Sequence, residues 1–221
     1  MTAISTSAQP AVIVLAGGAA VDARLASRLP SDATVIAADS GLASAGPLGL
    51  TVDLIVGDLD SVEPELLAAA RAAGVPIDAY PPDKDRTDLA LALDAAMQAD
   101  AARILVVGGH GGRLDHLLGN AALLASPTYR DAEVVAYMGT AIVTVLHGAA
   151  ERTTTLAGEI GDYVSLVAFH GPARGISTTG LRFPLDDADL AAGSSLGVSN
   201  EFAAPQATVC LRDGALLAIQ P

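Results

Sequence analysis

Short apolar runs alternate with stretches of helical spacing between residues 11 and 125. This alternation is typical of a parallel β-sheet covered by helices, and it limits the possible folds more than any other feature of the chain. The expected strands are residues 12–16, 34–38, 54–56, 76–79 and 103–107. The expected helices are residues 22–29, 63–73, 85–99 and 115–125. We therefore predict an N-terminal α/β domain built on a parallel sheet.

The pattern changes after Ser126-Pro127-Thr128, where strand-like runs follow one another with no room for helices. These runs are residues 133–137, 141–146, 153–156, 163–168, 175–179, 208–211 and 216–219, with turns expected at Met138-Gly139 and Gly171-Pro172. Such spacing indicates an antiparallel sandwich or barrel. The predicted fold class is therefore α/β, with a parallel-sheet α/β domain over residues 11–127 followed by an all-β sandwich or barrel domain over residues 128–221.

The net charge of −13 argues against a nucleic-acid partner, because such a partner requires Lys and Arg to neutralise its phosphates. A nucleotide remains compatible with this charge, since clustered carboxylates hold Mg²⁺ and the metal then carries the phosphates. The apolar stretches, such as residues 11–16 and 104–107, are far shorter than the roughly 20 residues that span a bilayer. No membrane partner and no signal peptide are indicated, and a cytoplasmic location is expected.

Four clusters of acidic residues and glycines stand at the ends of the expected strands. They are residues 38–41, 57–61, 83–88 and 108–116. The carboxyl ends of parallel strands meet at one edge of a sheet, and ligands of open α/β sheets bind there. We therefore expect the four clusters to converge on a single site.

The residue types in these clusters suit a polyphosphate with magnesium. Asp58 and Asp60, two positions apart on an irregular segment, can point into one space and offer the oxygen ligands that Mg²⁺ prefers. The glycines between residues 108 and 112 let backbone N–H groups approach an anion at a helix N-terminus. Arg113 can hold a phosphate with two parallel hydrogen bonds, and Lys84 adds a point charge.

Simpler interpretations exist for several of these residues. Asp39 taken alone fits a helix N-cap or a turn equally well. The glycine string matches neither the dinucleotide fingerprint nor the P-loop spacing. His116 fits equally well on the surface of a helix, and the remaining histidines are too scattered to indicate a zinc site.

The motifs together resemble those of the thiamine pyrophosphokinase family, in order and in spacing. The resemblance covers the chain from about residue 11 to the C-terminus and rests on Ala-Asp-Ser-Gly at 38–41, Gly-Asp-Leu-Asp-Ser at 57–61, Lys-Asp-Arg-Thr-Asp at 84–88, Gly-Gly-Arg-Leu-Asp-His at 111–116 and Ser-Asn-Glu at 199–201. It implies transfer of the diphosphoryl group of ATP to the hydroxyl of thiamine, which yields thiamine diphosphate and AMP. It also implies Mg²⁺ and a homodimer with its active sites at the subunit interface.

The resemblance also assigns expected roles to individual residues. The expected metal ligands are Asp58, Asp60, Asp88 and Asp115, which together with Arg113 form the expected catalytic set. Asp88 or Asp115 is the expected proton acceptor. The expected ATP contacts are Asp39, Ser40, Gly41, Ser61, Lys84, Asp85, Thr87, Gly111, Gly112 and Arg113. The expected thiamine contacts are Ser199, Asn200 and Phe202.

Two departures from the family pattern bear on the substrate. Ser40 stands where family members commonly have glycine, and the chain contains no Trp to stack on the flat, cationic thiamine. Phe202 is the candidate substitute, although a core or interface aromatic is an equally good interpretation of that residue. Two alternative functions therefore remain at this point: a pyrophosphokinase for another alcohol, such as a pterin, and a non-catalytic nucleotide-binding regulatory protein.

Overall fold

The computed structural model describes residues 10–148 and 152–221 of the chain. The chain separates into two compact units, of which unit 1 ends at Gly108 and unit 2 begins at Gly109. Among the described residues, none of the helices has the length and apolar character required to cross a membrane. The expected domain boundary near residue 128 stays a prediction.

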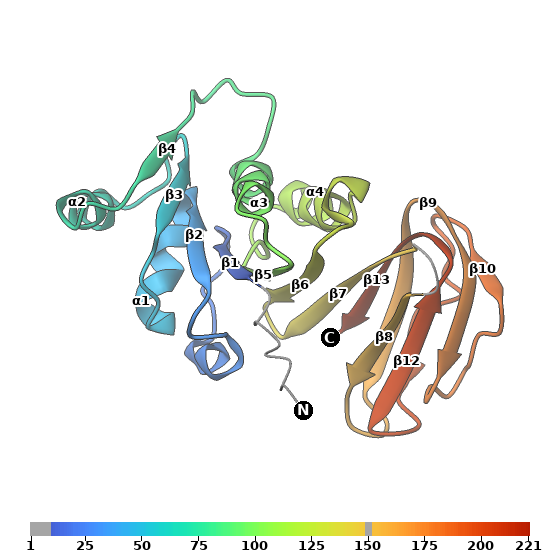
Figure 1. The fold of residues 1–221 in the computed structure, drawn as a ribbon. Coiled ribbons are helices and arrows are strands. Elements are labelled where there is room, and N and C mark those ends of the chain that lie inside the picture. Colours follow the sequence, from blue (N-terminus) through green and yellow to red (C-terminus); the bar gives the residue numbers. More distant parts are fainter. Residues whose placement is uncertain (1–9, 149–151) are drawn as a thin grey trace, which may run out of the picture. The chain divides into compact units, whose positions relative to one another are not determined.

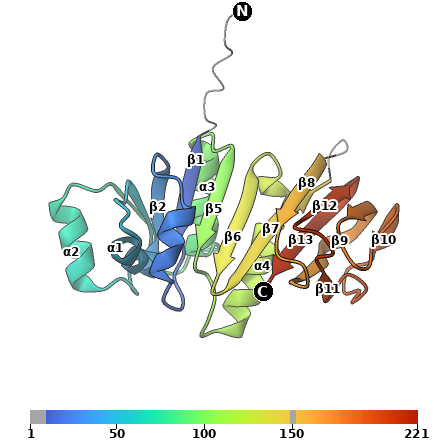
Figure 2. The ribbon, with the colours of Figure 1, turned by 90° about the horizontal axis from the view of Figure 1, so that it is seen from below.

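Unit 1 is built on a parallel sheet whose strands lie in the order β4-β3-β2-β1-β5 (Figure 1). All four neighbouring pairs are parallel, as the alternating sequence pattern predicted. Figure 2 shows β1, β2 and β5 side by side in a view from below. The strands are β1 (Ala11–Leu15), β2 (Thr34–Ala38), β3 (Leu54–Gly57), β4 (Ile77–Ala79) and β5 (Arg103–Val107).

The helices of unit 1 follow the predictions in part. Helix α3 packs against β1, β2 and β3 and buries its apolar side chains there. The helix predicted over residues 22–29 is instead the 3₁₀ helix η1, which buries none of its residues and therefore gains no packing energy from the sheet. The helical elements are η1 (Ala23–Arg28), η2 (Asp39–Ser44), α1 (Ala45–Leu48), α2 (Pro64–Ala72) and α3 (Asp88–Gln98).

Unit 2 begins with helix α4 (Leu114–Leu124) and the 3₁₀ helix η3 (Pro127–Tyr129) and continues as antiparallel strands. Six strands lie in the order β6-β7-β13-β9-β12-β8, and the short strands β10 and β11 pair with β9. Figure 1 shows these strands in yellow to red. They are β6 (Glu133–Met138), β7 (Ala141–His147), β8 (Arg152–Ala157), β9 (Tyr163–Thr179), β10 (Ala188–Leu190), β11 (Asn200–Glu201), β12 (Gln206–Leu211) and β13 (Asp213–Gln220).

Strand β9 corrects one sequence prediction. A turn was expected at Gly171-Pro172, but the strand runs through this point, and the pairing register with β13 shifts between Asp213 and Ala215. Gly171, with a φ of 137°, follows a residue that also has positive φ, so the backbone kinks here without reversing. The strand continues because its first part pairs with β13 and its last residues pair with β12.

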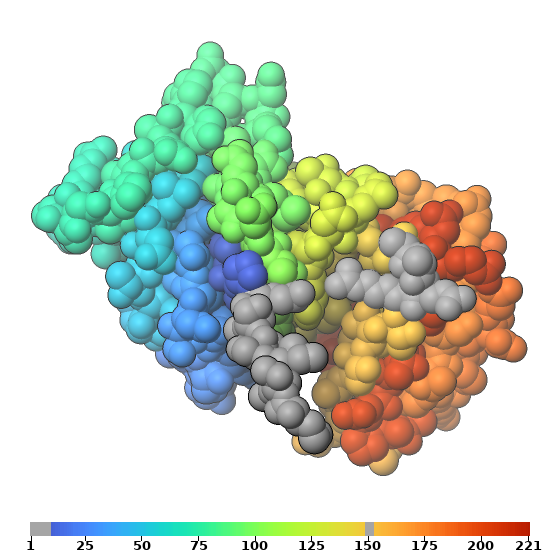
Figure 3. Space-filling model, viewed as in Figure 1, coloured from blue at the N-terminus to red at the C-terminus, as the bar shows by residue number. Residues whose placement is uncertain are grey.

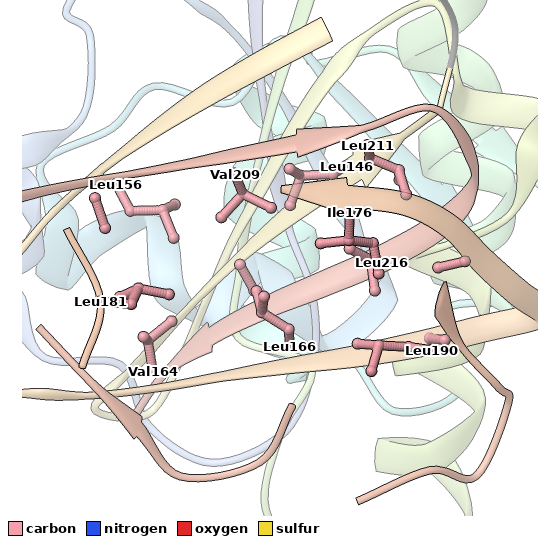
Figure 4. Close-up of a cluster of buried hydrophobic side chains, with 14 of the residues drawn as sticks. Leu146, Leu156, Val164, Leu166, Ile176, Leu181, Leu190, Val209, Leu211 and Leu216 are labelled. Atoms are coloured by element: carbon pink, nitrogen blue, oxygen red, sulfur yellow. The ribbon is translucent and has the colours of Figure 1, made fainter. Parts of the chain in front are cut away.

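The core of unit 2 lies between two groups of strands. One group is β7, β13 and the first part of β9, and the other is β8, β12 and the last residues of β9. Figure 4 shows leucines, isoleucine and valines from several strands meeting in one cluster. Leu166 and Leu216 belong to the group around β13, while Val209 and Leu211 belong to β12, and all four are buried. Apolar faces that meet in this way are those of a β-sandwich, so both parts of the predicted fold class are confirmed.

Candidate functional site

The carboxyl ends of β2 and β3 bring three acids together in unit 1. Asp39 directly follows β2, and Asp58 directly follows Gly57, the last residue of β3. Each of Asp39, Asp58 and Asp60 offers one carboxylate oxygen, and these oxygens lie within 4.8 Å of one another. The convergence that parallel strands imply is therefore present within this unit.

Gly57 permits a fourth acid to approach the group. Its φ of 147° lies in a region that favours glycine, and an added Cβ would lie 2.9 Å from Asp88 Oδ1 and 3.1 Å from Asp39 Cβ. Asp88 is the first residue of α3, whose N-cap is Thr87; the Thr87 hydroxyl oxygen accepts a hydrogen bond from the Ala90 N–H. The end of β3 thus lies between Asp39 and Asp88 because it has no side chain.

Lys84 provides the positive charge within the acid cluster. Its ammonium donates a hydrogen bond of 2.5 Å to Asp58 Oδ2 and lies 3.0 Å from Asp88 Oδ1. The hydrogen bond from Lys84 lowers the pKa of the Asp58 carboxyl. Burial acts to lower the pKa of Lys84, but its contacts with Asp58 and Asp88 outweigh burial and raise it. Both members of the Lys84–Asp58 pair therefore stay charged at neutral pH.

Asp39 differs from its neighbours because it is buried without a matching cation. The residue is 7% exposed, and its Oδ1 atom has no hydrogen-bond partner among the described residues. Burial raises the pKa of the Asp39 carboxyl, and the nearby carboxylates of Asp88, Asp58 and Asp60 act in the same direction. A buried acceptor with no partner costs free energy unless something binds to it. A cation bound at this carboxylate would satisfy that oxygen.

The remaining expected ATP contacts of unit 1 are placed around this cluster. The Ser61 hydroxyl donates a hydrogen bond of 2.8 Å to Asp60 Oδ1, and Asp85 is exposed. A Cβ added to Gly41 would lie 2.0 Å from the Leu15 carbonyl oxygen, so only glycine lets η2 approach the end of β1. A Cβ added to Gly17 would lie 2.2 Å from the Ser40 hydroxyl oxygen, so the absence of a side chain at Gly17 makes room for Ser40.

In unit 2, Arg113 and Asp115 form an exposed ion pair at the start of α4. Arg113 Nη2 lies 2.6 Å from Asp115 Oδ2, and the two side chains are 70% and 64% exposed. The Arg113 guanidinium lowers the pKa of Asp115 to about 2. Gly111 and Gly112 precede this pair and both have positive φ. Whether the pair joins the acids of unit 1 around one ligand stays a prediction.

The expected thiamine contacts of unit 2 differ in exposure. Ser199 is exposed, whereas Asn200 is buried. The Asn200 amide accepts hydrogen bonds from the backbone N–H groups of Phe183 and Glu201 and donates one to the Phe183 carbonyl. Phe202 is 1% exposed and belongs to the core cluster, where its ring packs against Gly158. Burial therefore favours the interpretation of Phe202 as a core aromatic.

Phe183 is an exposed aromatic residue, as are Tyr80 and Tyr163, and the sequence motifs did not point to it. It is 57% exposed, and the Arg182 guanidinium lies 5.3 Å from the centre of its ring. Arg182 also pairs with Glu201 at 2.8 Å, which balances its charge beside the ring. The available sequence signal was an aromatic residue between Arg182 and Pro184, in a chain with three Phe and no Trp.

Two family models match this chain. The model of the thiamin pyrophosphokinase catalytic domain matches residues 25–136, and the model of the thiamin pyrophosphokinase vitamin B1 binding domain matches residues 153–216. The chain belongs to the thiamine pyrophosphokinase family. The predicted enzyme class, a transferase of thiamine diphosphate biosynthesis, is thereby confirmed. The alternatives of another acceptor alcohol and of a non-catalytic protein are not favoured.

Curated and solved members of the thiamine pyrophosphokinase family agree with this assignment. Thiamine pyrophosphokinase from Bacillus subtilis is 27% identical over 185 residues, which are 84% of this chain and 86% of the relative. Thiamine pyrophosphokinase 1 from Oryza sativa is 28% identical over 155 residues, covering 67% of this chain and 58% of the relative. The Bacillus subtilis crystal structure superposes with a TM-score of 0.81 at 26% identity and covers 95% of this chain and 98% of its own.

A second solved family member gives a similar result. The crystal structure of thiamin pyrophosphokinase from Geobacillus thermodenitrificans has a TM-score of 0.78 at 28% identity, and it covers 95% of this chain and 96% of its own. The α/β unit followed by a β-rich unit is therefore the architecture of the thiamine pyrophosphokinase family.

Proposed function

We propose that this chain transfers the diphosphoryl group of ATP to the hydroxyl of thiamine with the help of Mg²⁺, and that AMP is the second product. The observation that carries the proposal is the acid cluster at the ends of β2 and β3, where the buried Asp39 Oδ1 lacks a partner. A bound nucleotide triphosphate carries several negative charges, so an acid cluster accepts it only together with a cation.

The donor set fits magnesium by its chemistry. Asp39, Asp58 and Asp60 each present a carboxylate oxygen within 4.8 Å of the others, and Mg²⁺ prefers a few carboxylates together with phosphate oxygens. Asp88 is the fourth expected ligand in unit 1 and Asp115 the expected ligand in unit 2. The metal would neutralise charge on the phosphates and polarise the phosphorus that is attacked.

We assign phosphate binding to cationic and backbone groups. Arg113 is exposed, and among the described residues its ion-pair partner is Asp115, so it can exchange this partner for phosphate oxygens. The glycines that precede Arg113 carry positive φ values, and we assign their backbone N–H groups to the phosphates at the start of α4. Lys84 adds an ammonium on the side of the carboxylates.

Thiamine binding is assigned to the region around Ser199. Phe183 offers an exposed ring for a flat cationic ligand, and Asn200 positions Phe183 through the hydrogen bonds to its backbone. Ser199 is exposed beside this segment, and its backbone N–H is held by the Ser165 hydroxyl. Phe202 supports the site from the core in this interpretation, while a direct contact of Phe202 with thiamine stays a prediction.

For this reaction, correct positioning of the two substrates matters more than covalent catalysis by the enzyme. The thiamine hydroxyl must align with the β-phosphorus while charge on the leaving AMP is stabilised. A carboxylate near the hydroxyl can accept its proton late in the reaction, and Asp88 and Asp115 are the candidates. The active enzyme is proposed to be a homodimer with the site at the subunit interface, which sedimentation equilibrium with and without substrates tests. A cytoplasmic location stays a prediction.

The deciding experiment identifies both products. The purified protein is incubated with ATP, Mg²⁺ and thiamine, and the products are separated and weighed by mass spectrometry. We expect thiamine diphosphate and AMP in equal amounts. Formation of ADP with thiamine monophosphate would overturn diphosphoryl transfer, and turnover of a pterin alcohol in place of thiamine would overturn the assigned acceptor.

A further inference from the structure

Lys84 is the only lysine of the chain, since the other eleven residues of the Lys and Arg total are arginines. The two residue types are not interchangeable. An ammonium is a compact charge on a flexible stem, whereas a guanidinium is a rigid planar fork. Every other residue of the Lys and Arg total is arginine. The one ammonium side chain, that of Lys84, lies within the acid cluster.

Lys84 is also the exception within its own segment. Residues 80–87 connect β4 to α3, and every one of them except Lys84 is exposed. Figure 3 shows this segment, in green, standing out from the rest of unit 1, and Figure 1 shows it as a long loop. The Lys84 side chain is only 10% exposed, because it reaches back from the loop to Asp58 and Asp88.

The ammonium of Lys84 holds the carboxylates that the proposed metal would use. Asp58 belongs to the group of three acids whose oxygens lie within 4.8 Å, and its Oδ2 atom accepts the hydrogen bond from Lys84. Carboxylates this close repel one another without a cation, but two cations on the same oxygens also repel. The ammonium and a divalent cation therefore compete for the Asp58 carboxylate.

We propose that Lys84 is a built-in counter-cation, which neutralises the acid cluster in the free enzyme and is displaced from Asp58 and Asp88 when Mg²⁺ binds. This inference rests on the proposed function, which assigns the acids to the metal. Displacement frees the ammonium at the edge of the site, where the phosphates of the nucleotide are the next available anions. Mg²⁺ binding and the movement of Lys84 away from Asp58 and Asp88 are then coupled.

The single lysine makes the test direct. Protein without nucleotide is prepared with isotope-labelled lysine, so that one side-chain signal reports on Lys84 by NMR, and is titrated with Mg²⁺. We expect the Cε–Hε signal to shift, with the same midpoint that calorimetry gives for Mg²⁺ binding. A metal that binds while this signal stays unchanged would overturn the exchange and leave the metal site of the proposed function intact.

Variants give an independent readout. Lys84→Met should bind Mg²⁺ about tenfold more tightly than the natural chain, because it removes the competing charge. Arg86→Met is the matched control, since it removes one positive charge from the same loop, but Arg86 pairs with Asp94. Its Mg²⁺ affinity should equal that of the natural chain. Lys84→Arg keeps the charge and should show no gain in affinity.

The failures can be told apart. Equal Mg²⁺ affinities for Lys84→Met and Arg86→Met would overturn the counter-cation, with melting temperatures confirming that both variants are folded. Binding of Mg²⁺ to Lys84→Met but not to the natural chain, with or without ATP, would show that the ammonium blocks the metal instead of being displaced by it, and would overturn the exchange. Absence of Mg²⁺ binding from every variant, with and without ATP, would instead overturn the metal site on which the inference rests.

Discussion

The acid cluster of unit 1 and the proposed ligand contacts of unit 2 differ in burial. In unit 1, Asp39 is buried near Asp58, and the largely enclosed Lys84 pairs with Asp58. In unit 2, Arg113 and Phe183 are exposed, and the buried Asn200 holds the backbone of Phe183 through hydrogen bonds. In the proposed function, the same side chains therefore serve stability and binding in unit 1, whereas different side chains serve them in unit 2.

This difference determines which measurements should change together. A substitution in the buried acid cluster changes the electrostatic energy of the fold as well as the affinity for a cation. A substitution at an exposed ion pair changes little in stability, because solvent already screens the charges. The following predictions test that separation.

Asp60→Asn should give the largest effect on activity. Asp60 is exposed, and the described contacts of its side chain are local, so the fold should be retained. Loss of a carboxylate that holds the metal should lower turnover at least about 10³-fold, a change of several kcal/mol in barrier height. The measurement is AMP release, with circular dichroism for the fold. Asp32→Asn, an exposed acid that precedes β2, should be active, and full activity of Asp60→Asn would remove Asp60 from the site.

Phe202→Ala should give the largest loss of stability. The ring is buried in the core cluster, and truncation of a buried Phe costs about 3–5 kcal/mol. Urea unfolding measures the loss. The thiamine KM of the remaining folded protein should change little. A raised KM with unchanged stability would instead show that Phe202 contacts the substrate directly.

Arg113→Ala should weaken ATP binding without loss of stability. Its pair with Asp115 is exposed, whereas a hydrogen bond to a charged phosphate contributes about 1.5–3 kcal/mol, so the ATP KM should rise at least roughly tenfold. Arg174→Ala, which breaks an exposed Arg–Asp pair in the same unit, should leave that KM unchanged. Equal effects of the two variants on the ATP KM would remove Arg113 from the phosphate site.

Phe183→Ala should raise the thiamine KM without loss of stability, the reverse of the result expected for Phe202→Ala. A cation over an aromatic ring contributes about 0.5–2 kcal/mol, so the KM should rise roughly threefold to thirtyfold. Phe183→Trp should preserve or improve the affinity. If Phe183→Ala binds thiamine as tightly as the natural chain, the exposed ring is not the stacking partner.

Asp39→Asn should stabilise the metal-free protein slightly. Burial raises the pKa of Asp39, so folding favours the protonated carboxyl and the natural chain loses stability as pH rises through that raised pKa. The variant and the natural chain should melt together below about pH 3, where both states are protonated. At neutral pH the variant should melt roughly 2–4 °C higher. A lower melting temperature at neutral pH would mean that the carboxylate is favourably paired in the metal-free protein.

The sequence anticipated unit 1 better than unit 2, for a physical reason. Parallel strands bring their carboxyl ends to one edge, so residues that directly follow β2 and β3 meet without further information. The ion pair between Lys84 and Asp58 could not be predicted, because a long loop can place its side chains in many ways. The region over residues 22–29 had helical spacing, but nothing in the sequence showed that none of its residues would be buried.

In unit 2, proximity along the chain was a poor guide to the site. Successive residues of an extended chain point to opposite faces, so Phe202 entered the core although the exposed Ser199 lies three positions before it. The exposed Phe183 is held by Asn200, which lies 17 positions further along the chain. The turn expected at Gly171-Pro172 does not form, because pairing with β12 and β13 keeps β9 extended on both sides of the kink. Such pairings are long-range contacts that local spacing does not reveal.

The placement of β13 has a consequence for synthesis on the ribosome. This strand follows all the other described strands in the sequence, yet it pairs with β7 on one side and β9 on the other. The five strands of unit 1, by contrast, are all present once residue 107 has emerged. Unit 1 can therefore begin to fold during translation, while β7 and β9 lack one strand partner until β13 has emerged from the ribosome. In a nascent chain stalled late in synthesis, β7 and β9 should be the strands most accessible to chaperones and most prone to aggregation.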